Sequence, residues 1–358
     1  MQDDLQLAVR ESAAIRMTGG GTKSALSERA NRSAAALTGV VEYDPQEFTV
    51  TIRSGTTLRD LHDLLGENRQ HLAFDPPFRA SGGTVGGTVA AGLSGPGRLQ
   101  FGGIRDFILG VEFIDGRGEL LRGGGRVVKN AAGFDFPKLM VGALGEFGIL
   151  TSVTFKVFPR PEANRTVRAS FGSLHEAVVA AGTLYRSPLQ PAAIEIHPPE
   201  TLYVRFSGSA AASHAGLRRA LEYLGTDTVE LQPESSRELW HGEREFEWAQ
   251  PAHALVKAAI NPLLVSGFDS ALTAVAGEVP RRYGVAGHVA HFTWPDRLPA
   301  SALNELLTGM GVPGLVLRGS GLPVRPGLHK GGSFAGRIRK VLDPDGKFLM
   351  NRKDNGST

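Results

Sequence analysis

The feature that most constrains this chain is a glycine-rich stretch at residues 80–110, ASGGTVGGTVAAGLSGPGRLQFGGIRDFILG. Glycine loses more conformational entropy on folding than other residues and packs no side chain, so this density needs a reason other than stability. Close approach of backbone to a bound nucleotide is such a reason, because successive N–H groups in tight turns cradle phosphate oxygens. A flexible linker is the alternative, but linkers are polar throughout, whereas Val85, Val89 and Leu93 prefer burial. The stretch therefore predicts a ligand-binding loop.

A second glycine cluster, Gly19–Gly20–Gly21–Thr22–Lys23–Ser24, lies nearer the N-terminus. A P-loop requires glycine directly before its lysine, and Thr22 occupies that position here, which argues against nucleotide hydrolysis. Three glycines with flanking hydroxyl groups still suit an anion-binding turn. Taken alone, this cluster is explained equally well as an ordinary tight turn, and the stretch at 80–110 favours anion binding.

Composition narrows the class of protein. The 358 residues are 41% hydrophobic and carry a net charge of +3, and the scattered basic residues give little support for nucleic-acid binding. The absence of cysteine excludes disulfides, an iron–sulfur cluster held by thiolates of this chain and a cysteinyl-linked cofactor. The N-terminus has no apolar signal region and no later run is long enough to span a bilayer, so we expect a cytoplasmic protein.

The first half of the chain mixes strand and helix signals. Thr57 followed by Asp60 predicts a helix N-cap, and Asp115–Gly118 predicts a hairpin turn. No G-x-G-x-x-G follows a strand and opens a helix, so the nucleotide site is not of the Rossmann type. Apolar periodicity predicts helices at 5–15, 58–65 and 136–144 and strands at 48–52, 108–114, 119–121 and 153–157.

The second half of the sequence predicts a separate α+β domain. Two prolines, Pro159 and Pro161, and a fall in glycine density predict a boundary at residues 160–164. A turn at 343–346 follows a basic helix, and we expect this end to return to the first domain, which gives domains at 1–160, 161–320 and 321–358. Within the second domain the pattern predicts helices at 174–184, 213–224, 234–248 and 302–307 and strands at 193–196, 202–206, 255–260 and 284–292.

The order of these motifs resembles the flavoprotein superfamily of vanillyl-alcohol oxidase (PCMH) type. TGGGTKS resembles its first pyrophosphate loop, the stretch at 80–110 its second, and LMVGALGEFGILTSVTFKVFPRP its closing strand. The resemblance covers Arg16–Pro161 and implies a two-lobed α+β fold, with a non-Rossmann FAD-binding domain and a smaller α+β cap for substrate or interface. The segment from Arg105 to Leu150 and the closing LDPDGKF most resemble the FAD-binding subunits of bacterial glycolate oxidases.

That resemblance implies partners and a flavin site. The partners are a larger FAD-containing 2-hydroxy-acid dehydrogenase subunit and an iron–sulfur subunit, and the complex could lie peripherally at the inner membrane. Neither histidine nor cysteine occurs in residues 80–110, so the FAD is expected to be non-covalent. The cofactor-binding residues implied by the motifs are Gly19, Gly20, Gly21, Thr22, Lys23, Ser24, Thr84, Val85, Gly86, Gly87, Ala90, Gly92, Ser94, Gly95, Gly145, Glu146, Gly148 and Ile149.

Catalytic residues are less evident. His288 and His291 fall in one predicted strand, three residues apart, so at most one of them faces a cleft, and structural roles are favoured for both. Arg318, Arg325 and His329 lie in a glycine-rich segment that could return over the flavin and hold a carboxylate. The H-x-G-D-G-N segment that longer relatives use for substrate and metal is missing, and no metal site is expected.

Three functions remain open from the sequence. The first is the FAD-binding subunit of a glycolate (2-hydroxy-acid) oxidase or dehydrogenase complex. The second is a stand-alone FAD-dependent oxidase of a sugar lactone or alcohol. The third is a structural subunit whose FAD is vestigial. Dependence on a partner separates the first two, and redox titration within a complex separates the third.

Overall fold

The computed structural model describes residues 2–125, 134–225, 227–249 and 253–349. The chain forms two compact units. Unit 1 contains residues 1–94, 102–160 and 330–358, and unit 2 contains residues 95–101 and 161–329. The expected boundaries at 160 and 320 differ from these units in two respects, because the short segment 95–101 and the segment 321–329 both group with unit 2.

Unit 1 is built on a five-stranded sheet in the order β3-β4-β8-β6-β7, and every neighbouring pair is antiparallel. The strands are β3 (Val40–Asp44), β4 (Thr49–Arg53), β6 (Ile108–Ile114), β7 (Leu120–Gly124) and β8 (Ile149–Lys156). A dinucleotide fold of the Rossmann type needs parallel strands joined by helical crossovers, so the non-Rossmann prediction is confirmed. The predicted hairpin turn joins β6 to β7, where the Asp115 carboxylate accepts from the N–H groups of Arg117 and Glu119.

The helices of unit 1 follow their capping signals. In α3 (Leu58–Glu67), the Thr57 hydroxyl accepts from the Asp60 N–H at 3.0 Å, as predicted. The other elements are short, and they are α1 (Gln2–Glu11), β1 (Met17–Thr18), α2 (Ser24–Ser27), β2 (Arg32–Ser33), β5 (Gln70–His71), α6 (Ile104–Phe107), α7 (Phe136–Met140) and β9 (Phe158–Pro159).

The glycine-rich stretch expected to be a ligand-binding loop is helical in part, because α4 (Val85–Ala91) lies inside it. The Thr84 hydroxyl caps α4 by accepting from the Gly87 N–H, and Gly92 ends the helix at φ +61°. A Cβ on Gly86 would lie 2.8 Å from the Ser54 Cβ. This glycine is therefore required for close packing of α4 against Ser54.

The C-terminal segment completes unit 1. After α13 (Gly332–Leu342), the Asp343 carboxylate accepts from the N–H groups of Lys347 and Phe348 and closes the predicted turn. Phe348 is buried in a cluster with Val9, Ile15 and residues of the sheet. The two ends of the chain thus share one apolar core.

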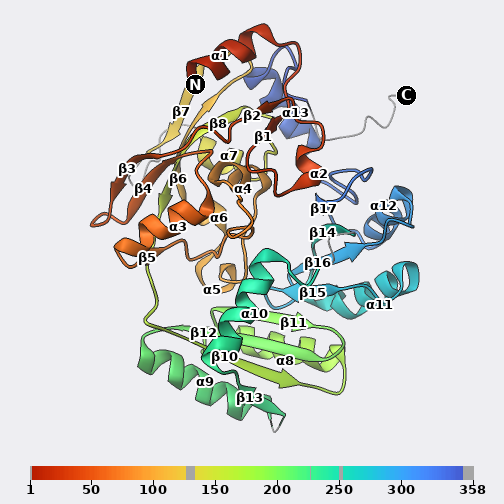
Figure 1. Ribbon diagram of the computed structural model, residues 1–358. Helices are drawn as coiled ribbons and strands as arrows, with labels where there is room; N and C mark the ends of the chain where they lie inside the picture. Colours follow the sequence, from red (N-terminus) through yellow and green to blue (C-terminus); the bar gives the residue numbers. More distant parts are fainter. Residues whose placement is uncertain (1, 126–133, 226, 250–252, 350–358) are drawn as a thin grey trace. The chain divides into compact units, whose positions relative to one another are not determined.

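Unit 2 is an eight-stranded antiparallel sheet in the order β13-β10-β12-β11-β15-β16-β14-β17 (Figure 1). Helices α8 and α9 pack on its strands, α8 against β11 and β12 and α9 against β10 and β12. The elements are α5 (Arg98–Phe101), β10 (Ala163–Ser170), α8 (Leu174–Arg186), β11 (Ala193–His197), β12 (Thr201–Gly208), α9 (Ala210–Leu224), β13 (Thr228–Glu230), α10 (Pro233–Glu245), β14 (Ala254–Ala259), η1 (Pro262–Leu264), α11 (Val265–Ala276), β15 (Arg281–Gly284), β16 (Val289–Trp294), α12 (Ala300–Gly309) and β17 (Gly314–Arg318).

Two local predictions in unit 2 are wrong. Helix α9 is capped by Ser209 and begins at Ala210, about one turn before the start expected at residue 213. The single strand expected at 284–292 is instead a hairpin, because Val285, Ala286 and Gly287 all have positive φ. His288 consequently lies in the turn, and His291 lies in β16.

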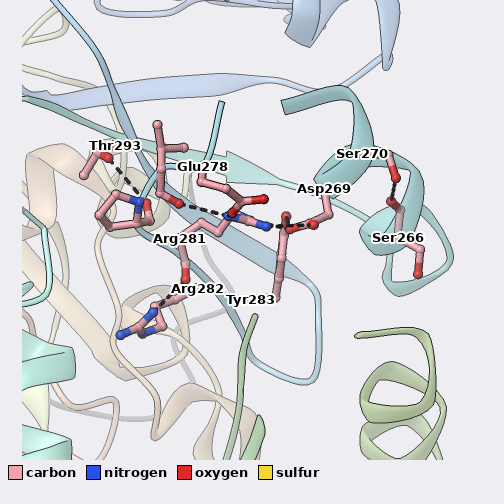
Figure 2. A network of polar contacts seen from close by, with 10 residues as sticks. Ser266, Asp269, Ser270, Glu278, Arg281, Arg282, Tyr283 and Thr293 are labelled. Carbon is pink, nitrogen blue, oxygen red and sulfur yellow. Dashed lines mark hydrogen bonds and ion pairs between the residues drawn. The ribbon is translucent and has the colours of Figure 1, made fainter. Parts of the chain in front are cut away.

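A polar network stabilises the α11 side of unit 2 (Figure 2). The buried Arg281 guanidinium contacts both oxygens of Asp269 and also Glu278, and the Tyr283 hydroxyl donates to Asp269 at 2.8 Å. Burial and the neighbouring Asp269 carboxylate raise the pKa of Tyr283. Each charged group in this network has a partner within it. We therefore assign the network a structural role, which is to hold β15 against α11.

Candidate functional site: a phosphate-binding pocket in unit 1

Three segments that are distant in sequence line one open pocket in unit 1, with an empty volume of about 810 Å³. They are the first glycine cluster, the first turns of α4 and the turn before β8. The predicted cofactor residues that line it are Gly19, Gly20, Gly21, Thr22, Lys23, Thr84, Gly86, Gly87, Ala90, Gly145, Gly148 and Ile149.

The first two segments touch through glycines. A Cβ on Gly20 would lie 2.1 Å from the Gly82 carbonyl oxygen, and one on Gly19 would lie 2.3 Å from the Thr84 hydroxyl. Gly21 has φ +69°, a conformation that disfavours other residues, and a Cβ there would point into open space. These glycines allow the two loops to pack closely, and they leave this part of the pocket wall without side chains.

Lys23 is the charged residue of the pocket. Its side chain is only 7% exposed, its ammonium donates to the Thr22 hydroxyl at 3.2 Å, and it lies 5.3 Å from the centre of the Phe78 ring. Burial lowers the pKa of Lys23 to about 8. Among the described residues no carboxylate pairs with this ammonium. A buried cation of this kind is favourable once an anion enters beside it.

The backbone beside Lys23 also favours the binding of an anion. Within the described part of the chain, the N–H groups of Gly20, Gly21 and Thr22 donate to no protein acceptor. Free N–H groups next to a buried ammonium form a cradle for the oxygens of a diphosphate. The donor set therefore fits the diphosphate of a dinucleotide such as FAD.

The third segment is attached to the end of α4. The Leu144 N–H donates to the Ala90 carbonyl at 2.8 Å, and the Gly142 N–H donates to the Val89 carbonyl at 2.9 Å. Gly145 has φ +77° and space around its missing Cβ. The turn thus presents backbone to the pocket, as the sequence predicted for this segment.

Six predicted residues do not line the pocket. Glu146 is buried with its carboxylate 3.9 Å from Arg339, and the Ser94 hydroxyl accepts from the Ile104 N–H. A Cβ on Gly92 would lie 3.2 Å from the Gly142 Cα, so Gly92 packs against the backbone of Gly142. The remaining three are Ser24, the buried Val85 and Gly95, which belongs to unit 2.

Other lining residues were missed by sequence reasoning. They are small or apolar and carry no motif of their own, although several flank the glycines that do. They comprise Met17, Thr18, Leu26, Ser27, Ala34, Ser54, Ala91, Met140, Ala143, Leu144 and Leu150.

The catalytic candidates all lie in unit 2. Arg318 donates to the Phe246 carbonyl at 3.5 Å, and burial lowers its pKa. The His329 ring nitrogen lies 3.1 Å from the Pro326 carbonyl. Arg325 directly precedes Pro326 in the sequence. Among the described residues, no group of three His, Asp or Glu side chains could hold a metal ion. A carboxylate-binding role for Arg318, Arg325 and His329 stays a prediction.

An antiparallel sheet flanked by two glycine-rich loops and a phosphate cradle defines an FAD-binding domain outside the Rossmann class. Residues 1–124 match the family described as "FAD binding domain", and this match supports FAD as the cofactor. The chain is 39% identical over 191 residues to glycolate oxidase subunit GlcE of Escherichia coli, which is 53% of each protein. It is 28% identical over 166 residues to glycolate oxidase subunit GlcD of Bacillus subtilis, and 29% identical over 163 residues to D-lactate dehydrogenase of Anaerostipes hadrus.

The matches span about half the length of GlcE and about a third of the other two relatives. Solved structures confirm the fold over the whole chain. p-Cresol methylhydroxylase superposes with a TM-score of 0.75 at 15% identity, covering 98% of this chain and 87% of that one. Alkyldihydroxyacetonephosphate synthase superposes with a TM-score of 0.73 at 15% identity, covering 99% and 75%. At this level of identity these likenesses show the fold alone, and the fold expected from the resemblance is confirmed.

No helix in the described ranges is both long and apolar enough to cross a bilayer.

Proposed function

We propose that this chain is the FAD-binding subunit of a complex that oxidises glycolate or a similar 2-hydroxy acid. The observation that carries the proposal is the 39% identity to glycolate oxidase subunit GlcE. The likeness to GlcD and to D-lactate dehydrogenase supports the same class of substrate. We also propose that the complex is cytoplasmic and lies peripherally at the inner membrane.

The residues of unit 1 have defined roles in this proposal. Bound FAD supplies the redox chemistry, by accepting a hydride equivalent and releasing single electrons. The ammonium of Lys23 and the N–H groups of Gly20, Gly21 and Thr22 hold the diphosphate. The backbone of the turn at Gly145 would help to hold the cofactor at this side of the pocket. Apolar residues such as Met140 and Leu150 exclude water from the pocket wall.

Electron transfer to an iron–sulfur cluster requires a partner. None of the 358 residues is cysteine, so these residues cannot ligate an iron–sulfur cluster through thiolates. We therefore propose a larger flavoprotein subunit and an iron–sulfur subunit as partners. The absence of cysteine, and of histidine in residues 80–110, also supports non-covalent attachment of the flavin.

Co-purification tests the proposal. The tagged chain is isolated from its native host, and associated proteins are identified by mass spectrometry. We expect a second, larger flavoprotein and a protein with cysteine clusters, and glycolate-dependent dye reduction by the isolated complex. A partner-free chain that oxidises a sugar lactone or an alcohol would favour a stand-alone oxidase. A complex that is equally active when this chain carries no FAD would make its cofactor vestigial.

A further inference from the structure

One face of the unit 2 sheet carries a row of basic side chains. Lys257 of β14 lies directly opposite His291 of β16, and Arg282 of β15 lies opposite the same histidine. Residues paired across antiparallel strands project from the same face of a sheet. Arg282, His291 and Lys257 therefore form one continuous row over three strands. The neighbouring Arg281 alternates to the other face, where the network of Figure 2 lies.

The first member of this row is neutralised within the protein. The Arg282 guanidinium contacts the buried Glu243 carboxylate at 3.4 Å and lies 5.0 Å from the centre of the Trp248 ring. The same Glu243 oxygen lies 3.2 Å from His197. The negative charge of Glu243 is thus shared by Arg282 and His197 at that end of the row.

Lys257 differs from Arg282 in this respect. It is the only lysine between residues 161 and 329, in a region rich in arginine. Within the described residues, its ammonium has neither a carboxylate nor a hydrogen-bond acceptor as partner. Burial, and then the nearby charge of Arg98, lowers the pKa of Lys257 to about 8, so the side chain is mainly cationic at neutral pH.

His291 beside it is neutral. Burial, followed by the charges of Lys257 and Arg98, lowers the pKa of His291 to about 3. Its ring packs edge-on against Phe246 at 5.0 Å between ring centres. A neutral imidazole can accept one hydrogen bond and donate another, so it can pair with a hydroxyl group next to a bound anion.

Two further side chains of unit 2, Arg318 and Trp248, also carry hydrogen-bond donors. The Arg318 guanidinium donates to the Phe246 carbonyl at 3.5 Å, while its buried Nε has no partner in the described part of the chain. The buried indole Nε1 of Trp248 lacks a partner among these residues as well. A purely structural role would favour an apolar residue over an unpaired, partly buried lysine, because an unpaired charge is unfavourable there.

We propose that Lys257, with His291, binds the carboxylate and hydroxyl groups of a small 2-hydroxy acid. Lys257 supplies charge for the carboxylate, and the neutral His291 ring pairs with the 2-hydroxyl. The choice of a hydroxy acid rests on the proposed function, whereas the affinity for a small carboxylate rests on the cluster itself. The cluster replaces Arg318, Arg325 and His329 as the first place to test substrate binding.

Tryptophan fluorescence measures this binding without turnover. All three tryptophans, Trp240, Trp248 and Trp294, lie in unit 2, so the emission of the full FAD-loaded chain reports on this unit. Glycolate and acetate are titrated into the wild type and into Lys257→Met, Lys257→Arg and the control Arg219→Met, which changes an exposed residue of α9. Thermal unfolding and flavin absorbance establish that each variant is folded and loaded.

We expect the wild type to bind glycolate more tightly than acetate. Lys257→Met weakens glycolate binding by about 10- to 100-fold, as expected for the loss of a charge-assisted contact. Lys257→Arg retains binding within about 10-fold, and Arg219→Met binds as the wild type does. Unchanged glycolate affinity in folded Lys257→Met, or no glycolate binding by the wild type, would overturn the site.

Failure of the proposed function gives a different pattern. If acetate and glycolate bind equally and both depend on Lys257, the carboxylate site stands and the assignment to a hydroxy acid fails. NMR of His291 provides a second measurement that needs no ligand. Removal of the charge of Lys257 raises the pKa of His291 in Lys257→Met, and an unchanged pKa would contradict the cluster.

Discussion

Replacement of Lys23 by methionine separates stability from cofactor binding. A fall in the pKa of Lys23 from 10.5 to about 8 corresponds to about 3 kcal/mol of free energy. Because the folded state binds this proton less tightly than the unfolded state, the penalty is fully present below pH 8 and disappears between pH 8 and 10.5. The contact with the Phe78 ring offsets about 0.5–1 kcal/mol of it. Lys23→Met should therefore stabilise the FAD-free protein by about 2 kcal/mol at pH 7.

The same substitution weakens FAD binding. The ammonium forms a charge-assisted contact with the diphosphate, and such contacts contribute about 1.5–3 kcal/mol, so we expect a loss of about 10- to 100-fold in affinity. Above pH 8 the wild type must take up a proton to bind FAD, so its dissociation constant rises with pH. The dissociation constant of Lys23→Met stays flat over the same range.

Urea unfolding of FAD-free protein and fluorescence titration with FAD measure the two effects. Lys340→Met, which changes an exposed residue of α13, is the matched control in unit 1 and should alter neither. A Lys23→Met variant that binds FAD as tightly as the wild type, or that is less stable than the wild type without FAD, would refute the assignment of Lys23.

Three further predictions concern the fold and the cofactor. Gly86→Ala should destabilise unit 1 by about 1–3 kcal/mol in urea unfolding because the new Cβ meets Ser54 at 2.8 Å, whereas Gly66→Ala in α3, with nothing within 4 Å, should be neutral or stabilising by up to about 1 kcal/mol. The reverse order would contradict the packing of α4. Acid precipitation should release the flavin into the supernatant, and a yellow pellet would indicate a covalent bond. Asp269→Ala should lower the free energy of unfolding by about 3–5 kcal/mol because it leaves the Arg281 guanidinium buried without its main partner, and a loss below 1 kcal/mol would show that Glu278 suffices.

Features with a local cause could be predicted from the sequence. The Thr57 cap and the hairpin turn at Asp115 depend on residues a few positions apart, so their signals are visible in the chain itself. Anion binding by the first glycine cluster stays a prediction, because the cluster taken alone suits an ordinary tight turn equally well.

Features with a tertiary cause could not be predicted. Gly86 is required by Ser54, and Gly19 by Thr84, which are distant contacts that only the folded chain shows. The hairpin between β15 and β16 depends on positive φ at Val285, which a β-branched residue rarely adopts. Because this turn was not predicted, the pairing of His291 with Lys257 could not be predicted either.

Anaerobic addition of glycolate, monitored by flavin absorbance near 450 nm, tests the central proposal most directly. The measurement is made on the purified single chain loaded with FAD and on the complex isolated with its partners. We expect the single chain to keep its absorbance and the complex to bleach within one turnover. Rapid bleaching of the single chain alone would contradict the account and would identify a stand-alone enzyme.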